Sequence, residues 1–302
     1  MRILLFGANG QVGWELQRSL SPLGEILACD LNNVDLENQS ALKALILDYK
    51  PTVIVNAAAH TAVDKAESEP EKAKRINADA VEIMASEAKK LNAWLIHYST
   101  DYVYDGTKAN TESYIETDTT NPQSVYGKTK LQGEESIRKS ECKHLIFRTS
   151  WVYAAHGNNF IKTMIRLAKE KDELKIIADQ TGAPTSAELI ADITALCLHQ
   201  LFHNNHNNEQ LIGTYHLTPT GETNWHGFAK FAISEALKKG ASLKTTPEKI
   251  YPITTSEYPL PATRPANSRL NCTKLCNSFM IQLPPWQKHV TRLISEIYTV
   301  EA

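Results

Sequence analysis

The sequence predicts an α/β protein with a doubly wound parallel sheet and a smaller C-terminal α/β lobe. Within residues 1–150, short apolar and β-branched runs alternate with longer amphipathic stretches, and a glycine-rich turn joins the first run to the first stretch. Strands separated by helices form parallel sheets. After Arg148 the alternation is less regular. We therefore expect residues 151–302 to form mainly the smaller, substrate-binding lobe, with some segments returning to the first domain.

The spacing of apolar residues places the individual elements. The expected strands are residues 2–6, 25–29, 52–55, 93–98 and 144–147. The expected helices are residues 11–20, 39–49, 71–90 and 124–139 in the first domain, and 159–169, 187–202 and 224–238 after it. The proline-rich run 251–265 is expected to be an extended loop, and the Asn- and His-rich run 202–209 a solvated loop rather than a metal site.

Composition excludes several classes of protein. The 302-residue chain has 42% apolar and 22% charged residues, as ordinary globular proteins do. Its 32 Lys and Arg nearly balance its 34 Asp and Glu, so we expect no nucleic-acid partner. No apolar run reaches the roughly 18 residues of a membrane span. The five Cys include no CxxC pair, which indicates reduced thiols. These observations predict a soluble, cytoplasmic protein.

A glycine-rich turn follows the first expected strand directly and opens the first expected helix. Its glycines are Gly7, Gly10 and Gly13, and Gln11 and Val12 lie between the last two. In this setting glycines permit a tight turn, close approach of a pyrophosphate and close helix packing, with the phosphates at the helix N-terminus. The turn therefore predicts a Rossmann-type domain that binds a dinucleotide.

Two acidic residues follow where the adenosine half of a dinucleotide would lie. Asp30 ends the second expected strand, where a carboxylate can accept both ribose hydroxyls. Residues 31–33 contain no Arg for a 2′-phosphate, which favours NADH and leaves main-chain contacts as the route for NADPH. Asp35 and Leu36 would flank the adenine. For Asp35, an acid at the start of a helix is an equally good explanation.

A tyrosine and a lysine four residues apart share one helix face, where the ammonium can lower the pKa of the phenol. The sequence contains this spacing twice. Tyr104 and Lys108 are separated by a turn sequence, so we discard that match. Tyr126 and Lys130 begin an expected helix, and Thr100 ends the fourth expected strand, where its hydroxyl could orient a ketone oxygen. These three residues predict a carbonyl reductase.

Longer segments resemble a known family. GANGQVG at 7–13, NAAAHTAVD at 56–64, STDYVYDG at 99–106 and YGKTK at 126–130 resemble the extended short-chain dehydrogenase/reductase family. RTSWVY at 148–153, DQTGAPT at 179–185 and RPANSRL at 264–270 resemble its dTDP-4-dehydrorhamnose reductases in particular. The resemblance spans essentially the whole chain. It implies NAD(P)H-dependent reduction of the C4 ketone of dTDP-4-dehydro-β-L-rhamnose to dTDP-L-rhamnose, the last step in making this sugar donor.

The resemblance also assigns roles by matching segment. Tyr126 is the general acid, Lys130 lowers its pKa and binds the ribose, and Thr100 holds the ketone. Cofactor contacts fall on Ala59, His60, Thr61 and Tyr98, and sugar contacts on Thr100, Asp101 and Trp151. The alternatives are a structural loop histidine for His60 and a core residue for Trp151. Arg264 or Arg269 would hold the diphosphate of the dTDP-sugar, unless they only brace their loop.

Some relatives of this kind form homodimers through Mg²⁺ held by glutamates, and Glu15, Glu188 and Glu296 fall in the matching segments. For any one of them, a solvated helix carboxylate is the better explanation. Two other functions stay open: another nucleotide-sugar 4-ketoreductase, and a non-catalytic regulatory subunit with the same fold.

Overall fold

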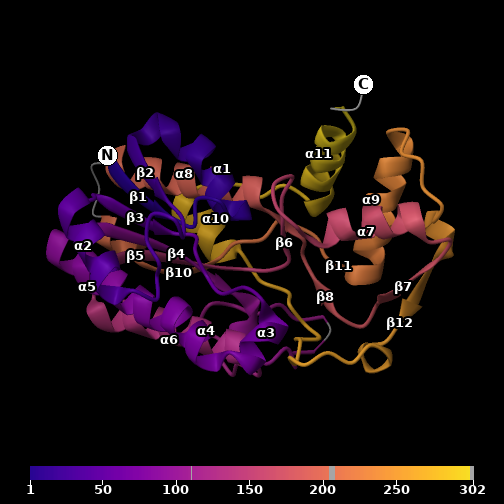
Figure 1. Cartoon of the computed structure of the whole chain (residues 1–302), viewed down its shortest axis with the longest axis horizontal. Coiled ribbons are helices and arrows are strands. Elements are labelled where there is room, and N and C mark those ends of the chain that lie inside the picture. The colour runs from indigo at the N-terminus through magenta and orange to yellow at the C-terminus, as the bar shows by residue number, and fades with distance from the viewer. Residues whose placement is uncertain (110, 204–207, 300–302) are drawn as a thin grey trace.

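A six-stranded parallel sheet forms the centre of the larger lobe (Figure 1). The computed structural model describes residues 1–109, 111–203 and 208–299. The strands are β1 (Arg2–Phe6), β2 (Glu25–Cys29), β3 (Val53–Asn56), β4 (Trp94–Thr100), β5 (Lys143–Thr149) and β10 (Gly213–His216). Their order is β10-β5-β4-β3-β1-β2, and all neighbours are parallel. The strand order reverses at β1: β2 lies on one side of it, and β3, β4 and β5 follow on the other side. Sheets of this kind bind ligands at the carboxyl ends of the two strands where the order reverses, here β1 and β3.

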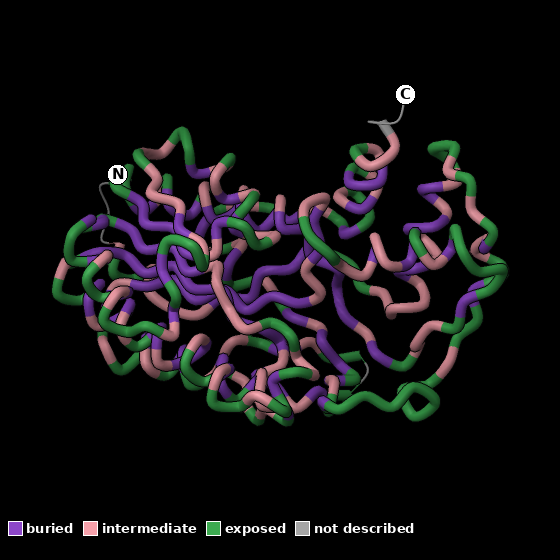
Figure 2. The backbone as a smooth tube through the Cα atoms, in the orientation of Figure 1, coloured by how far each residue is buried: buried purple, intermediate pink, exposed green. Residues whose placement is uncertain are grey.

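Helices cover both faces of this sheet, as the sequence predicts for a doubly wound fold. One face carries α1 (Gln11–Leu20), α8 (Ala187–His203) and α10 (Thr273–Phe279). The other carries α2 (Gln39–Tyr49), α5 (Ala80–Leu91) and α6 (Val125–Ser140). Alternate residues of β1 enter the two cores: Ile3 and Leu5 pack toward α1 and α8, whereas Leu4 and Phe6 pack toward α2 and α5. Figure 2 shows the strands buried and the outer turns exposed.

The segment expected as one helix at 71–90 is interrupted. It consists of α4 (Pro70–Lys74), a π-helical turn (Arg75–Asp79) and α5, with the short α3 (Val63–Ser68) before it. Within the π turn, the side chain of Asn77 accepts a hydrogen bond from the backbone N–H of His60 (2.8 Å) and donates to its carbonyl (3.2 Å) and to Thr129 Oγ1 (3.1 Å). Asn77 therefore fixes the loop after β3 against α6.

The smaller lobe has its own apolar core. Its helices are α7 (Phe160–Glu170), α9 (Trp225–Lys238) and α11 (Trp286–Thr299), which pack around the buried Phe228, Ile161 and Val290. Short strand pairs line its inner side: β6 (Val152–Tyr153) with β9 (Thr185–Ser186), β8 (Thr181–Gly182) with β11 (Thr223–Asn224), and β7 (Leu174–Ile177) with β12 (Ile250–Ile253). This lobe lies at the carboxyl ends of the large sheet (Figure 1).

Several elements differ from the sequence expectation. The run expected as a loop at 251–265 begins within β12, which pairs with β7 and so takes the extended form of a strand. In the Asn- and His-rich run, α8 extends to His203 and Asn208–Leu211 form a 3-10 turn, while residues 204–207 lie outside the described residues. None of the helices in the described part of the chain has the length and apolarity that a membrane crossing requires.

Candidate active site

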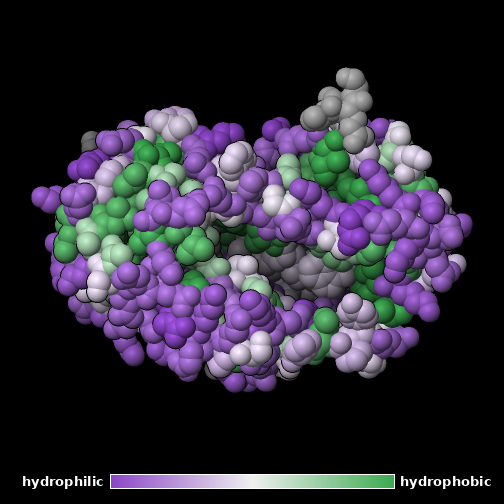
Figure 3. All heavy atoms as spheres, viewed as in Figure 1, coloured by the Kyte–Doolittle hydropathy of each residue, from purple (hydrophilic) through white to green (hydrophobic). Residues whose placement is uncertain are grey.

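A cavity of about 810 Å³ opens at the carboxyl ends of β1, β3 and β4, between the two lobes. The space-filling view shows a hollow between the lobes (Figure 3). Most residues singled out from the sequence line this cavity: Gly7, Gly10, Gln11, Val12, Asp30, Asp35, Leu36, Ala59, Thr61, Tyr98, Thr100, Asp101, Tyr126, Lys130 and Trp151. Residues from distant parts of the chain thus meet in one pocket, hereafter the central pocket.

The glycine loop forms one wall of the central pocket. Gly7 has φ +81°, and a Cβ there would lie 2.6 Å from the backbone nitrogen of Ala58. A Cβ on Gly13 would lie 2.0 Å from the carbonyl oxygen of Gly7, so Gly13 lets α1 begin directly against the loop. Gly10 caps α1 without a side-chain hydrogen bond, which leaves the first N–H groups of the helix open to an anion. This wall fits a pyrophosphate.

Asp30 lies at the edge of the central pocket, tied to the glycine loop. Its carboxylate accepts a hydrogen bond from the side-chain amide of Asn9 and another, 2.8 Å long, from the backbone N–H of Asn32. Asp35 Oδ1 accepts from the backbone N–H of Glu37 (2.9 Å), in the turn before α2. Both acids face the pocket, and the bond to Glu37 shows that Asp35 also has a local structural role.

Tyr126 lies in the first turn of α6. Ser124 Oγ accepts from the N–H of Gly127 (3.1 Å), and Glu67 from α3 accepts from the N–H of Val125 (2.8 Å). Burial raises the pKa of Tyr126 to about 12; a hydrogen bond with Thr100 opposes the rise, and the charge of Asp101 adds to it. Burial dominates this shift, and the lowering of the pKa of Tyr126 by Lys130 stays a prediction.

Lys130 is only 1% exposed, although it carries an ammonium when protonated. Its Nζ donates to the carbonyl oxygen of Tyr98 (2.6 Å) and lies 3.2 Å from His97 Nε2. Burial lowers the pKa of Lys130 to about 8, and the charge of Glu134 opposes the shift. Burial therefore makes Lys130 easier to deprotonate than a solvent-exposed lysine.

Thr100 and Asp101 join the end of β4 to the smaller lobe. Thr100 Oγ1 donates to Asp101 Oδ1 (3.1 Å), and Ser268 Oγ donates to Asp101 Oδ2 (2.5 Å). Burial raises the pKa of Asp101 to about 6, while the hydrogen bonds from Ser268 and Thr100 act in the opposite direction. Trp151 closes the pocket nearby with φ +49°, stacked on Trp225 at 3.8 Å. It both lines the pocket and packs against the smaller core.

Comparison with known proteins identifies the family. The family model described as RmlD substrate binding domain matches residues 1–299. A dTDP-4-dehydrorhamnose reductase of Escherichia coli (strain K12) is 50% identical over 100% of both chains. The chain belongs to the dTDP-4-dehydrorhamnose reductase family. A solved reductase from Clostridium acetobutylicum superposes with a TM-score of 0.87 at 37% identity, covering 98% of this chain and 99% of the other. A solved reductase from Bacillus anthracis, in complex with NADP, superposes with a TM-score of 0.85 at 34% identity. This alignment covers 100% of this chain and 99% of the other.

Three residues that the sequence analysis placed in this reductase site, His60, Arg264 and Arg269, are not among the residues that line the central pocket. His60 Nε2 is 3.5 Å from a carboxylate oxygen of Glu69, which fits the alternative of a structural loop histidine. Arg264 forms a two-point ion pair with Asp64 of α3, at 3.0 and 2.7 Å. Arg269 pairs with Glu222 in the same way, at 2.5 and 3.1 Å. These carboxylates occupy both guanidinium groups.

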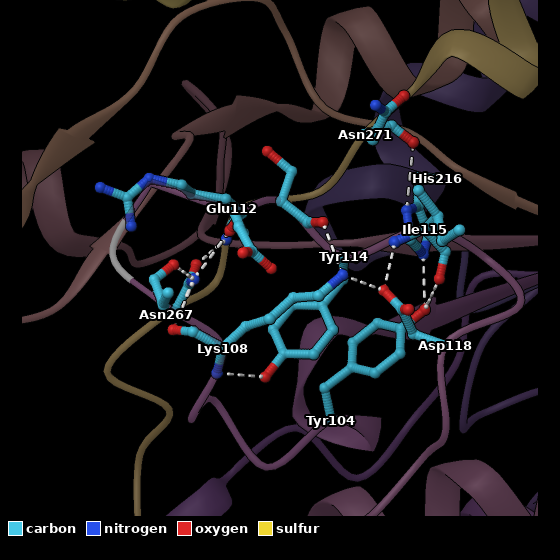
Figure 4. A network of polar contacts seen from close by, with 12 residues as sticks. Tyr104, Lys108, Glu112, Tyr114, Ile115, Asp118, His216, Asn267 and Asn271 are labelled. Carbon is cyan, nitrogen blue, oxygen red and sulfur yellow. Dashed lines mark hydrogen bonds and ion pairs between the residues drawn. The ribbon is translucent and has the colours of Figure 1, made fainter.

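The discarded tyrosine and lysine have other partners in this reductase (Figure 4). The hydroxyl of Tyr104 accepts from Arg148 (2.6 Å) and contacts His216 Nε2 (2.8 Å), while Lys108 Nζ bonds Asp118 (2.6 Å). The side-chain amide of Asn267 contacts three carbonyls of the loop, at Lys108, Ala109 and Glu112. Neither Tyr104 nor Lys108 is among the residues that line the central pocket.

The three glutamates considered as Mg²⁺ ligands lie close to one another in the structure. Glu15, Glu188 and Glu296 line a second pocket of about 220 Å³ between α1, α8 and α11. Arg292 already pairs there with Glu188 (2.8 Å) and Glu296 (3.4 Å), and Arg18 pairs with Glu15 (3.3 Å). Across residues 1–109, 111–203 and 208–299, no three His, Cys, Asp or Glu are grouped to hold a metal. These residues fit an arginine network, and the Mg²⁺ expectation is not supported.

Sequence reasoning missed several residues of the reductase site. Asn9 lines the pocket and bonds Asp30. Tyr102 lines it edge-on to Tyr126, with ring centroids 5.5 Å apart. Ser150 also lines it. All three lie inside the segments that carry the family resemblance, so their position beside predicted site residues was the available signal.

Proposed function

We propose that this protein reduces the C4 ketone of dTDP-4-dehydro-β-L-rhamnose to dTDP-L-rhamnose, using NADPH or NADH. One observation carries the proposal: a single pocket brings Thr100, Tyr126 and Lys130 to the dinucleotide loop. Identity of 50% to the E. coli reductase over the whole chain supports the same reaction. The larger lobe, built mainly from residues 1–150 with α8, β10 and α10, would hold the dinucleotide, and the smaller lobe the sugar nucleotide.

The central pocket fits a nicotinamide dinucleotide. The N–H groups at the start of α1 would hold its pyrophosphate, and Asp30 the ribose of its adenosine. Ala59, Thr61 and Tyr98 also line this pocket, and the carbonyl oxygen of Tyr98 lies 2.6 Å from Lys130 Nζ. When bound, NAD(P)H supplies the hydride. Asp30 favours the free hydroxyls of NADH, while the NADP complex of the Bacillus anthracis relative supports NADPH as well.

The residues of the pocket supply the proton chemistry. The hydroxyl of Thr100 would orient the ketone oxygen toward Tyr126. As hydride adds to C4, Tyr126 gives its hydroxyl proton to the ketone oxygen, which leaves an alcohol on the sugar and a phenolate on the enzyme. A protonated Lys130, one turn along α6, stabilises that phenolate. Burial of the pair strengthens this interaction because water screens it less.

Absorbance at the nicotinamide band, followed after adding dTDP-4-dehydro-β-L-rhamnose, tests the proposal. We expect oxidation of the cofactor and a product that NMR identifies as dTDP-L-rhamnose. A different 6-deoxyhexose would indicate a related 4-ketoreductase. Tight cofactor binding without oxidation would indicate a binding module and contradict the proposal.

A further inference from the structure

Three buried polar side chains form a chain behind the central pocket: Asn56 at the end of β3, His97 in β4 and Lys130 in α6. They are 1%, 0% and 1% exposed. Asn56 and His97 are register partners in neighbouring strands, and Asn56 Nδ2 lies 3.2 Å from His97 Nδ1. His97 Nε2 lies 3.2 Å from Lys130 Nζ. The reaction proposed above assigns no role to Asn56 or His97.

The orientation of Asn56 fixes the tautomer of His97. Asn56 Oδ1 accepts a hydrogen bond from the backbone N–H of Ala58 (3.1 Å), and this group can only donate. The amide nitrogen of Asn56 must therefore face His97, where it donates to Nδ1. A neutral imidazole that accepts at Nδ1 carries its hydrogen on Nε2.

The Nε2–H of His97 then points at Lys130 Nζ. An ammonium has no lone pair to accept this hydrogen, whereas an uncharged amine has one. The amine still has a hydrogen for the carbonyl of Tyr98, which lies 2.6 Å away. We propose that Asn56 and His97 are positioning residues that stabilise the uncharged amine of Lys130 by a hydrogen bond from His97 Nε2.

The charged groups around Lys130 do not prevent His97 from stabilising the uncharged amine. Glu134, one turn further along α6, favours the ammonium, but Arg148 of β5 holds it at 2.9 and 2.6 Å and Arg138 at 3.1 Å. Tyr126 and Asp101 lie on the pocket side. Burial lowers the pKa of Lys130 to about 8, and burial together with Lys130 lowers that of His97, which keeps the imidazole neutral.

Nitrogen-15 NMR of the cofactor-free enzyme tests the tautomer, whatever sugar the enzyme reduces. The chain has 10 His, so the His97→Phe variant assigns the signals by removing them. We expect wild-type His97 to show a hydrogen on Nε2 and none on Nδ1. In Asn56→Asp the new carboxylate keeps the bond from Ala58 but accepts from Nδ1, so the hydrogen should move to Nδ1. A wild-type hydrogen on Nδ1 overturns the proposal.

The pH dependence of the reduction rate tests whether this hydrogen bond lowers the pKa of Lys130. This test rests on the proposed function. Reduction needs the ammonium of Lys130, so activity falls as pH rises through its pKa. In His97→Phe and in Asn56→Asp this fall should move upward by about one pH unit, because a hydrogen bond of ordinary strength changes proton binding about tenfold. His144→Phe, which removes another buried histidine, is the matched control and should not move it. An unmoved fall in Asn56→Asp, whose Ala58 bond is preserved, overturns the proposal.

Discussion

Lys130 Nζ lies 2.6 Å from the carbonyl oxygen of Tyr98, and this hydrogen bond ties α6 to β4. Thr100 follows Tyr98 by two residues on the strand, and Tyr126 precedes Lys130 by one helical turn. This buried contact helps to place the phenol of Tyr126 beside the hydroxyl that would orient the ketone. It also holds the ammonium of Lys130 in a buried position, where burial lowers its pKa.

Removing the phenol hydroxyl of Tyr126 should strongly reduce turnover and leave the cofactor site in place. We expect Tyr126→Phe to lower kcat about 10²- to 10⁴-fold, because the hydroxyl gives its proton only as hydride reaches the ketone. The dissociation constant of NADH, measured by fluorescence titration, should stay close to that of the wild type.

Tyr104→Phe is the matched control. Its hydroxyl bonds Arg148 and His216 at a distance from the reacting groups, so the loss should appear in thermal stability rather than in kcat. If Tyr104→Phe lowers kcat more than Tyr126→Phe does, the assignment of the general acid is wrong.

The parts of the fold that sequence predicted well depend on local patterns. The helices at 11–20 and 39–49 match α1 and α2, because their apolar residues recur at helical spacing. β10 was missed because its four residues, Gly213–His216, have no apolar run and become a strand only by pairing with β5. The break at Arg75–Asp79 was missed for a similar reason, since Asn77 bonds residues distant in sequence.

The same difference between local patterns and long-range contacts holds for the site. Thr100, Tyr126 and Lys130 could be predicted because each has a short-range signal, a strand end or a helical spacing. The contact of His97 with Asn56 joins residues 41 apart, and the pairing of Arg264 with Asp64 joins residues 200 apart. Such contacts follow from sheet order and lobe packing, which no local spacing encodes.

The carboxylate of Asp30 should set the preference between the two cofactors. Asp30→Ala is expected to raise the KM for NADH more than that for NADPH, because the carboxylate accepts ribose hydroxyls and repels a 2′-phosphate. Steady-state KM ratios measure this. Asp35→Ala removes another acid of the same pocket and should leave the ratio unchanged. An unchanged ratio in Asp30→Ala would mean that Asp30 does not face the ribose.

Asp101 should reduce stability at neutral pH. Burial raises its folded pKa from 3.8 to about 6, so its favourable effect is present below about pH 4 and is lost as pH rises through 6. The unfolding free energy of Asp101→Asn, relative to wild type, should therefore increase by up to about 3 kcal/mol between about pH 4 and 7. Urea titrations at several pH values measure it, and a flat difference contradicts the assignment.

The substrate should be a nucleotide-linked ketose rather than a free sugar. A diphosphate and a nucleoside offer binding energy away from the reacting carbon, and the enzyme can use that energy to align C4. We expect kcat/KM for the dTDP-linked ketone to exceed that for the free 4-keto sugar by at least about 10³-fold. Equal values would rule out the nucleotide-sugar assignment.

The same assay decides what Arg264 does. Its guanidinium pairs with Asp64 at 3.0 and 2.7 Å, which supports a brace between the proline-rich run and α3 rather than a diphosphate ligand. If it is a brace, Arg264→Ala and Asp64→Ala should both lower kcat/KM with the preference for the dTDP group intact, and Asp64→Ala should lower it at least as much, because Asp64 also accepts from the backbone N–H of Ala262 (3.1 Å). If Arg264 holds the diphosphate, only Arg264→Ala should erase that preference, because Asp64→Ala leaves the guanidinium free to bind. Arg269→Ala and Glu222→Ala form the parallel pair, and a preference that survives all four changes assigns the diphosphate to other groups of the pocket.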